Sequence, residues 1–380
     1  MNVMFLAPGR SIHSNNWASA MCDRGHTVHF VTQESFIVNE YSFLDSVDPR
    51  LIIHKLPFKG KAGFLFNAVA VKKLTKTIKP DIIHVQQAAG YGFLGTFTDK
   101  SKAFVSVYGW EVYDLARKKL WKPLVGYVLH WYKHIGSTSH CMKEQIKIVL
   151  KGKNTPIAVT PFGINVNKFK YCGVEKSEII VGTVKKMDKK YGMEYLIQAF
   201  AKALVEMEVL CPSIYERMFL ELVGPGNQID ELKMLAAHLG IQGRVRFIGR
   251  VTHSDVPKWL NRFDIYAAPS CCIESFGVAV LEASACGCPV VVSNVGGLPE
   301  VVVDNQTGCI VPSRDIDELA KILKMLLLDK KKRVEMGKAG IMWVEEKYEW
   351  QHCIDIMEDI YNAIHRNEYE RLFHQQEAFM

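Results

Sequence analysis

Pro269-Ser270-Cys271-Cys272-Ile273-Glu274-Ser275-Phe276-Gly277-Val278-Ala279-Val280-Leu281-Glu282-Ala283 is the stretch of this 380-residue sequence that decides its fold. The apolar run just before it, residues 265–268, has the length of a strand buried on both faces. Pro269 ends that strand, and the small and apolar residues from about 276 to 286 predict a helix packed closely on a sheet. Gly287 and Pro289 end the helix, so the stretch is predicted to be a strand end, a tight loop and a buried helix.

This stretch contains two carboxylates, Glu274 and Glu282. At ~1.5 Å per residue they lie roughly 12 Å apart along the helix axis. Acid and base residues that act on one bond are closer, about 5–10 Å apart. The spacing therefore suits two contacts along one extended ligand, and the free N–H groups at the helix start between them suit a phosphate. A sugar nucleotide would fit this pattern, and two solvated acids beside an ordinary strand, loop and helix are the alternative.

The composition is that of a globular protein long enough for two domains, with 48% apolar and 23% charged residues. No run of 18 apolar residues occurs, so no transmembrane helix is expected, and residues 1–8 lack the basic start of a signal peptide. The ten cysteines include no Cys-x-x-Cys pair, which favours reduced thiols over disulfides or a zinc site. These features indicate a cytoplasmic protein.

Positive charge is concentrated in the first half of the chain. Residues 1–165 hold 21 Lys and Arg against 10 Asp and Glu, and the remainder holds 26 against 30. In residues 59–79 and 112–136 the basic residues alternate with aromatic ones, a pattern that suits an anionic membrane surface. A solvated helix face is the alternative, and no motif for reading nucleic acid is present. The aromatic residues in these segments include Phe64, Phe66, Trp121, Trp131 and Tyr132.

Strands and helices alternate in both halves of the sequence. The sequence predicts a βαβ unit at its start, with a strand at 3–7, a loop at 8–16, a helix at 17–24 and a strand at 27–32. The loop has a single glycine, Gly9, and therefore lacks the glycine-rich fingerprint of a dinucleotide-binding site. The pattern restarts after a polar linker at about 171–177. The fold class predicted is α/β, with two doubly wound, Rossmann-like domains facing across a cleft. The predicted strands of the second half include 178–184, 219–224, 244–249 and 265–268.

The opening stretch resembles the Glu-x7-Glu signature of glycosyltransferase family 4, which has the GT-B fold. The resemblance continues through Ala283 to Val291 and through Gly296-Gly297-Leu298-Pro299-Glu300. Upstream, residues 161–169 are similar to the family's domain-junction motif, with Asn165 where Asp is commoner. The resemblance implies that a C-terminal helix crosses back onto the first domain. The expected domains are therefore 1–168 with about 350–380 on the acceptor side, and 177–349 for the nucleotide-sugar donor.

The resemblance also implies roles along the donor. Glu282 would take the ribose hydroxyls, and Glu274 would contact the transferred sugar. Backbone N–H groups at the helix start would hold the sugar or the distal phosphate, and the backbone after the strand at 244–249 would meet the base. The donor-binding residues are then Glu282, Ser275, Phe276, Gly277, Val278, Arg250 and Val251.

The family places an Arg and a Lys after the first strand of the second domain, where they neutralise the diphosphate. This sequence has no Arg there, but four lysines within residues 182–192. Lys185 and Lys190 have the best spacing and are expected to act with Glu274 in catalysis. Lys186 and Lys189 are alternatives for this role. A third possibility is that the segment is a solvated basic loop. No acidic cluster suits a metal, since Asp315 and Asp317 stand at a predicted helix start. The resemblance implies a metal-independent, retaining transfer with no cofactor beyond the nucleotide-sugar co-substrate.

The first domain departs most from the family. Its first loop carries His13 and Asn15, which could reach the acceptor or the donor phosphate, or lie in a solvated loop. Tyr108 stands where many relatives place a His, so a general base there is less expected. His84 is predicted to end a strand on the cleft side, with a core histidine as an equal alternative.

Together these features predict a retaining hexosyltransferase that moves a sugar from a nucleotide-sugar to a lipid-linked or polysaccharide acceptor in cell-surface glycan synthesis. We expect it in the cytoplasm, peripheral on the inner face of the plasma membrane. A non-catalytic sugar-nucleotide or anionic-lipid binding protein is one alternative, and a nucleotide-sugar epimerase of the same fold is another. The donor base, the sugar and the acceptor are not specified by the sequence.

Overall fold

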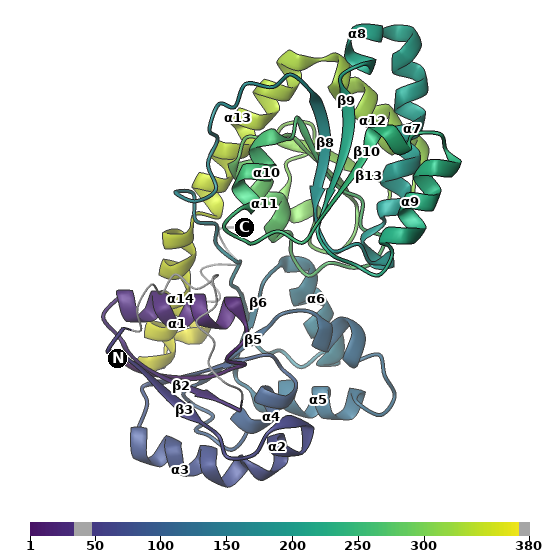
Figure 1. Cartoon of the computed structure of the whole chain (residues 1–380). Coiled ribbons are helices and arrows are strands. Elements are labelled where there is room, and N and C mark those ends of the chain that lie inside the picture. The colour runs from purple at the N-terminus through teal and green to yellow at the C-terminus, as the bar shows by residue number, and fades with distance from the viewer. Residues whose placement is uncertain (34–47, 372–380) are drawn as a thin grey trace. The chain divides into compact units, whose positions relative to one another are not determined.

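The computed structural model describes residues 1–33 and 48–371, and the chain divides into two compact units (Figure 1). The first unit contains residues 1–161 and the C-terminal residues from Gln351, and the second contains Phe162–Trp350. The sequence predicts the first boundary at 168–177, whereas the units divide after Pro161, so all of the junction motif except Pro161 belongs to the second unit. The expected extent of the first domain to residue 380 passes beyond the described residues.

Unit 1 is built on a seven-stranded parallel sheet in the order β3-β2-β1-β4-β5-β6-β7. Its strands are largely buried, as expected where helices cover both faces of a parallel sheet, and β1 reads as the continuous apolar run Val3-Met4-Phe5-Leu6. The strands are β1 Asn2–Leu6, β2 Thr27–Thr32, β3 Leu51–Lys55, β4 Ile82–Gln86, β5 Ala103–Val107, β6 His134–Ser137 and β7 Ile157–Val159.

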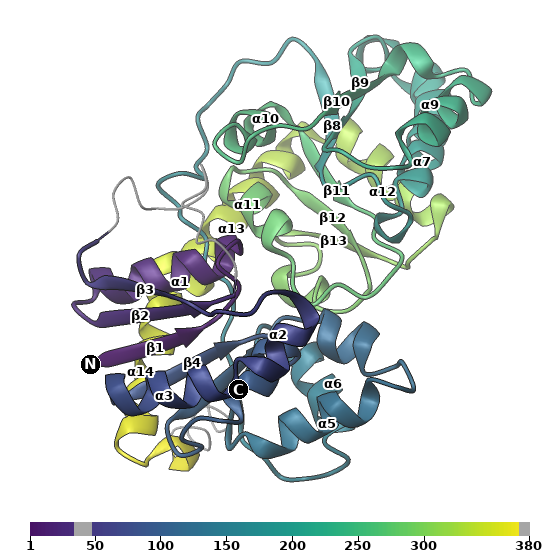
Figure 2. The ribbon, with the colours of Figure 1, turned by 60° about the horizontal axis from the view of Figure 1, so that its bottom comes forward.

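Helices cover both faces of this sheet. One face carries α1 and α14, and the opposite face carries α2, α3, α4 and α5 (Figures 1 and 2). Tyr132, expected on the basic surface, is instead fully buried at the end of α5 and donates its hydroxyl to the carbonyl of Gly92. The helices are α1 Ile12–Asp23, α2 Gly60–Phe66, α3 Ala68–Ile78, α4 Gly90–Gly95, the short π-helix Glu111–Leu115, α5 Lys122–Trp131, α6 His140–Val149 and α14 Trp350–His365.

Helix α1 begins five residues earlier than the sequence predicts. The polar run 11–16 was expected to be a loop, but Ser11 caps the helix by accepting the N–H of Ser14 through its side chain. Ser14 and Asn15 are buried, and Asn15 donates from Nδ2 to the carbonyl of Gly9 at 3.4 Å. The polar side chains therefore satisfy local backbone groups inside the fold.

Unit 2 has a six-stranded parallel sheet in the order β10-β9-β8-β11-β12-β13. The strands are β8 Ile179–Val184, β9 Met218–Val223, β10 Val245–Gly249, β11 Ile265–Ala268, β12 Val290–Ser293 and β13 Gly308–Val311. The helices are α7 Met193–Leu210, α8 Pro212–Tyr215, α9 Ile229–His238, α10 Val256–Arg262, α11 Val278–Ala285, α12 Ile316–Leu328 and α13 Lys330–Lys347. The opening stretch of the sequence therefore forms the end of β11, its loop and α11, as predicted.

The C-terminal helix α14 packs on the first sheet, which confirms the expected crossing back. The hydroxyl of Tyr361 in α14 bonds to Nδ1 of the buried His84 in β4. At the end of α1, Arg24 pairs with Asp355 at 2.5 Å and with Glu358 at 3.3 Å. Residues from the far end of the chain thus complete unit 1.

Within residues 1–33 and 48–371, no helix combines the length and apolar character that crossing a bilayer requires.

Candidate active site

The donor residues expected from the sequence gather where the strands of unit 2 end. In a parallel sheet the loops after the strands' carboxyl ends share one edge, and ligands bind there. Lys185 directly follows β8, and Glu274 lies in the loop between β11 and α11. Lys185 Nζ lies 2.6 Å from Glu274 Oε2, and Ser270 Oγ donates to Oε1 of the same carboxylate. The fold therefore brings together an acid and a base separated by 89 residues.

A second lysine joins this pair through an aromatic ring. The ammonium groups of Lys185 and Lys190 each lie 4.8 Å from the centre of the Tyr191 ring. Burial alone would lower the pKa of Lys190, but Tyr191, Asp188 and Glu274 raise it overall. Two positive charges thus converge beside Glu274.

The other two lysines of this loop, Lys186 and Lys189, are exposed, and Lys190 is exposed as well. What distinguishes Lys190 is its position over the Tyr191 ring. The backbone of Lys185 is held by the neighbouring strand end, because its N–H donates to Val223 and that of Met187 donates to Pro225. A Cβ atom on Gly224 would lie 2.0 Å from the carbonyl oxygen of Lys185, so this close contact requires glycine.

The glycine pair Gly296-Gly297 packs against the backbone of Glu274. Gly296 has φ +56°, and a Cβ there would lie 2.1 Å from the carbonyl oxygen of Glu274. The N–H of Gly297 donates to that same oxygen at 2.8 Å. The backbone of Glu274 is therefore held in place by residues that lack side chains.

The start of α11 presents backbone groups to this site. Gly277 precedes the helix and Val278 is its first residue, so the N–H groups of Val278 and Ala279 have no acceptor within the helix, whereas that of Val280 donates to Gly277. The Phe276 side chain is buried and packs edge-on against Phe162 and Tyr348. Phe276 can therefore contribute only its backbone, while Ser275 is partly exposed.

Glu282 ends a chain of three charged and polar side chains. Its Oε1 lies 3.0 Å from His253 Nε2, and His253 Nδ1 lies 2.8 Å from Lys168 Nζ. An ammonium group can only donate, so a protonated Lys168 makes Nδ1 an acceptor and places the proton of neutral His253 on Nε2, facing Glu282. Burial lowers the pKa of Lys168, and Glu282 opposes that shift.

His253 was not anticipated from the sequence. It follows Arg250 and Val251, the residues expected beside the base, which lie just beyond β10 and are exposed and partly buried respectively. The position of His253 in the sequence does not identify it as a site residue, because its contact with Glu282 spans 29 residues and depends on the packing of the loop after β10 against α11.

In unit 1, the loops at the carboxyl ends of the strands are organised by Glu111. Its buried carboxylate accepts the backbone N–H groups of Ala88 at 3.1 Å, Tyr108 at 3.4 Å and Gly109 at 2.9 Å. Burial raises the pKa of Glu111, and these backbone bonds act in the opposite direction. Glu111 therefore ties the loop after β4 to the loop after β5.

His13 and Tyr108 lie near each other in unit 1, with ring centres 6.3 Å apart. Burial raises the pKa of Tyr108 well above its usual range, which keeps the phenol protonated. Tyr108 can act as a hydrogen-bonding group there, as the sequence suggests, and not as a base.

His84 does not end a strand, and this part of the prediction is wrong. It is the third residue of β4, fully buried between Tyr361 and Ser106, whose Oγ lies 2.8 Å from Nε2. Burial lowers the pKa of His84 to about 3, so the ring is neutral. The structure favours the core histidine, because the strand continues for two residues beyond it.

Asp315 caps α12 by accepting the N–H of Glu318, as the sequence predicts. In the described part of the chain, no group of three or more His, Cys, Asp or Glu side chains is arranged to hold a metal ion.

Two protein-family models together match most of the chain. The model of "Glycosyl transferase 4-like" proteins matches residues 2–139, and that of "Glycosyl transferases group 1" matches residues 167–343. The chain belongs to glycosyltransferase family 4.

Characterised relatives in family 4 cover this chain to different extents. A GDP-mannose-dependent α-(1-6)-phosphatidylinositol monomannoside mannosyltransferase of Mycobacterium tuberculosis is 36% identical over 148 residues, which is 37% of this chain and 38% of that enzyme. The chain thus matches little more than a third of that relative's length. N-acetyl-α-D-glucosaminyl L-malate synthase of Bacillus anthracis is 24% identical over 95% of each chain.

Solved structures of similar fold match this family 4 chain from end to end. Sucrose-phosphate synthase of Thermosynechococcus elongatus has a TM-score of 0.77 at 19% identity, covering 96% of this chain and 99% of that one. Anabaena HepE in complex with UDP has a TM-score of 0.78 at 17% identity, covering 96% and 100%. The two units are therefore the Rossmann-like domains of the GT-B fold.

Proposed function

We propose that this chain is a retaining, metal-independent glycosyltransferase that moves a hexose from a nucleotide-sugar to a lipid-linked or polysaccharide acceptor in cell-surface glycan synthesis. The observation that carries the proposal is the convergence of Lys185, Lys190 and Glu274 at the start of α11. The names of the relatives support it, since one is a mannosyltransferase for a phosphatidylinositol mannoside and HepE was solved with UDP.

In this proposal the two lysines stabilise the departing diphosphate. Positive groups fixed in advance where negative charge develops are among the largest contributions to enzyme catalysis. The N–H groups at the start of α11 add partial positive charge, which favours a phosphate group. Glu274, already positioned by Lys185 and Ser270, would contact the sugar, and Glu282 would hold the ribose hydroxyls.

Retention follows if the acceptor attacks from the face that the diphosphate leaves. The acceptor oxygen forms the new glycosidic bond as the bond to the diphosphate breaks, and the departing diphosphate oxygen accepts the acceptor's proton. No protein nucleophile takes part, and none is needed. The lysines then neutralise the charge that remains on the nucleoside diphosphate.

The decisive experiment is a donor screen by thermal shift with UDP-, GDP- and ADP-sugars, on the wild type and Glu282→Ala. We expect one nucleotide class to raise the wild-type melting temperature and to have little effect on the variant, because Glu282 would no longer hold the ribose. A wild type that no nucleotide stabilises would exclude the donor site.

Transfer of labelled sugar to an acceptor then separates the enzyme from a non-catalytic binding protein. Conversion of the donor sugar without transfer would instead identify the epimerase alternative. The configuration of the new bond, read by NMR of the product, tests retention.

We also propose that unit 1 docks on the cytoplasmic face of an anionic membrane through a basic-aromatic surface around α2, α3 and the start of α5. Lys118, Lys119 and Lys122 are exposed there, and Leu120 and Trp121 between them expose 89% and 40% of their surface. On α2 and α3, Phe66 and Val69 are likewise exposed at 59% and 78%. Lysines beside exposed apolar side chains fit the boundary between lipid headgroups and acyl chains.

The membrane proposal is tested with vesicles containing anionic lipid. Each lysine near such a surface contributes about 1 kcal/mol, so Lys118→Glu/Lys119→Glu/Lys122→Glu should weaken binding by about 100-fold or more. The matched control reverses three exposed lysines of unit 2, Lys321, Lys331 and Lys338, and should bind like the wild type. Equal binding by the unit 1 variant and the wild type would remove this surface from the proposal.

A further inference from the structure

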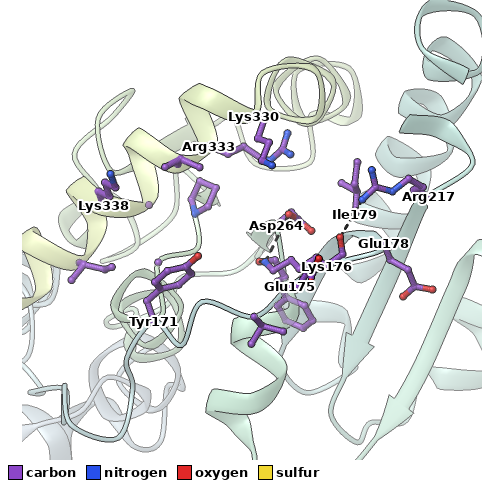
Figure 3. A pocket seen from close by; sticks show the side chains of 17 residues that line it. Tyr171, Glu175, Lys176, Glu178, Ile179, Arg217, Asp264, Lys330, Arg333 and Lys338 are labelled. Atoms are coloured by element: carbon purple, nitrogen blue, oxygen red, sulfur yellow. Dashed lines mark hydrogen bonds and ion pairs between the residues drawn. The ribbon is translucent and has the colours of Figure 1, made fainter. Parts of the chain in front are cut away.

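Unit 2 contains a pocket at the edge of its sheet opposite the donor loops. The pocket has a volume of about 530 Å³ and lies where β8, β11 and β12 begin, since Ile179, Asp264 and Pro289 line it. Its walls are the segment before β8, which includes Tyr171, and the first half of α13 (Figure 3). Pockets of roughly 300–1,000 Å³ hold small organic ligands.

A buried guanidinium group lines this pocket. Arg333 of α13 is only 8% exposed, and its Nη1 donates to the carbonyls of Leu326 and Leu327 at the end of α12. In the described part of the chain, no acceptor is recorded for its Nε and Nη2 groups. An arginine stays protonated at neutral pH, so this side chain keeps donors that face no protein acceptor.

Three carboxylates and five basic side chains line the pocket. Two of the carboxylates, Asp264 and Glu178, are already engaged, and Glu175 is exposed. Asp264 accepts the backbone N–H of Ile180 at 2.9 Å and lies 3.8 Å from Lys176 Nζ. Glu178 is bound at 2.6 Å by Arg246, which does not line the pocket. Lys330 and Lys338 line the pocket from α13 and are exposed. The electrostatic balance of the lining therefore favours an anion.

The rest of the lining is apolar or aromatic. Tyr171 is 59% exposed and Val334 is 48% exposed, and Val174 and Ile341 complete this part of the wall. In Figure 3, Tyr171 lies across the pocket from the α13 residues Arg333 and Lys338. A ligand here would meet positive charge on one side and an aromatic ring on the other.

We propose that this pocket is a second binding site of the chain, for a small organic phosphate whose anionic group binds Arg333 and Lys330 and whose apolar part packs on Tyr171. The site is separate from the donor loops, because its residues lie at the amino ends of the strands that carry those loops. A ligand in it would bridge α13 to the segment that leads into β8.

The test measures binding of inorganic phosphate and phenyl phosphate by calorimetry in a Lys185→Ala/Lys190→Ala background, which weakens phosphate binding at the donor loops. We expect both probes to bind, phenyl phosphate more tightly, and Lys330→Glu/Lys338→Glu to weaken binding by about tenfold or more. Both positions are exposed, and Glu at the first position of α13 suits a helix start, so this variant should fold. The matched control is Lys331→Glu, whose lysine is 86% exposed and does not line the pocket.

Three results would overturn the proposal. Neither probe binds in the Lys185→Ala/Lys190→Ala background, or the Lys331→Glu control loses as much affinity as Lys330→Glu/Lys338→Glu, or phenyl phosphate binds no more tightly than inorganic phosphate. Tungstate, a heavy phosphate analogue, should give an anomalous peak beside the Arg333 guanidinium in crystals of the wild type. A peak at Lys185 and Lys190 alone would support the donor site and overturn this one.

Discussion

The two units share one architecture and use the carboxyl ends of their strands in opposite ways. In unit 2, the side chains of Glu274 and Glu282 keep 14% and 10% exposure, and each faces a side chain that can carry positive charge. In unit 1, Glu111 is fully buried and bonds only backbone N–H groups. Glutamate therefore pairs with basic side chains in one unit and holds loop backbones together in the other.

The positive charge differs in the same way. Unit 2 places Lys185 and Lys190 inside its site, where they meet Glu274 and Tyr191. The lysines of unit 1 described above, Lys118, Lys119 and Lys122, are exposed just before α5 and at its first residue. Under the proposed function, unit 2 would be organised before the donor binds, and the exposed lysines of unit 1 would bind a larger anionic surface.

The largest expected effect separates the lysines of the donor loop. Removing one group that stabilises developing charge typically costs 10²–10³ in rate, so Lys185→Ala/Lys190→Ala should lower kcat by about 10⁴ or more. Lys186→Ala/Lys189→Ala is the matched control and should change kcat less than about threefold, because the contacts with Glu274 and the Tyr191 ring are made by Lys185 and Lys190. Initial rates with labelled donor measure both. Equal losses would mean that charge, and not its placement, is what the loop supplies.

The second prediction contrasts the acids of the two units. Glu111→Ala leaves three backbone N–H groups without their acceptor and should cost roughly 3–5 kcal/mol of unfolding free energy. Glu274→Ala should abolish most transfer while changing stability far less. Urea unfolding and transfer rates on both variants give the answer. A stable Glu111→Ala protein that is inactive would place Glu111 in the site.

The third prediction uses the pH dependence of His84. Its pKa is about 3 in the folded state and about 6.5 when unfolded, so the stability it contributes is present above pH 6.5 and is lost as the pH falls toward 3. Between pH 7 and pH 4 the wild type should lose about 3 kcal/mol more than His84→Gln, which cannot titrate. Urea unfolding at both pH values measures this difference, and parallel pH profiles would refute a buried neutral ring.

The smallest expected effect concerns His253. If it positions Glu282, His253→Ala should raise the KM for the donor by about tenfold and leave kcat nearly unchanged, since the lost interaction is one hydrogen bond to a charged group. His238→Ala, at the exposed end of α9, is the control. A fall in kcat with unchanged KM would instead give His253 a part in the chemical step.

The sequence was most informative where apolar runs are continuous. It predicts β11, α11 and β12 because buried parallel strands and a closely packed helix carry strong apolar patterns. It does not identify β3, whose Ile52 and Ile53 are each 40% exposed at the sheet edge, or β6, whose sequence His-Ile-Gly-Ser has one large apolar residue. In β6, a Cβ on Gly136 would lie 2.5 Å from the Phe104 ring, so its glycine reflects packing that the local pattern does not reveal.

The candidate site was predictable to a similar degree. A signature motif marks Glu274 and Glu282, but the choice of Lys185 and Lys190 depends on where the Tyr191 ring lies. His253 reaches Glu282, and Tyr361 reaches His84 across 277 residues, only through tertiary packing. Contacts of this kind have no signal in the spacing of residues along the chain.

The return of α14 to the first sheet sets the order in which the molecule can be made. The face of β4 that holds His84 lacks Tyr361 until α14 has been synthesised, although β1 to β7 are synthesised first. Unit 2 is one uninterrupted segment, Phe162–Trp350, and can fold while unit 1 still lacks its covering helix. Domains usually fold in the order of their synthesis, whereas here the second unit can be complete before the first. Unit 1 is therefore expected to finish folding only after the whole of unit 2 has been synthesised.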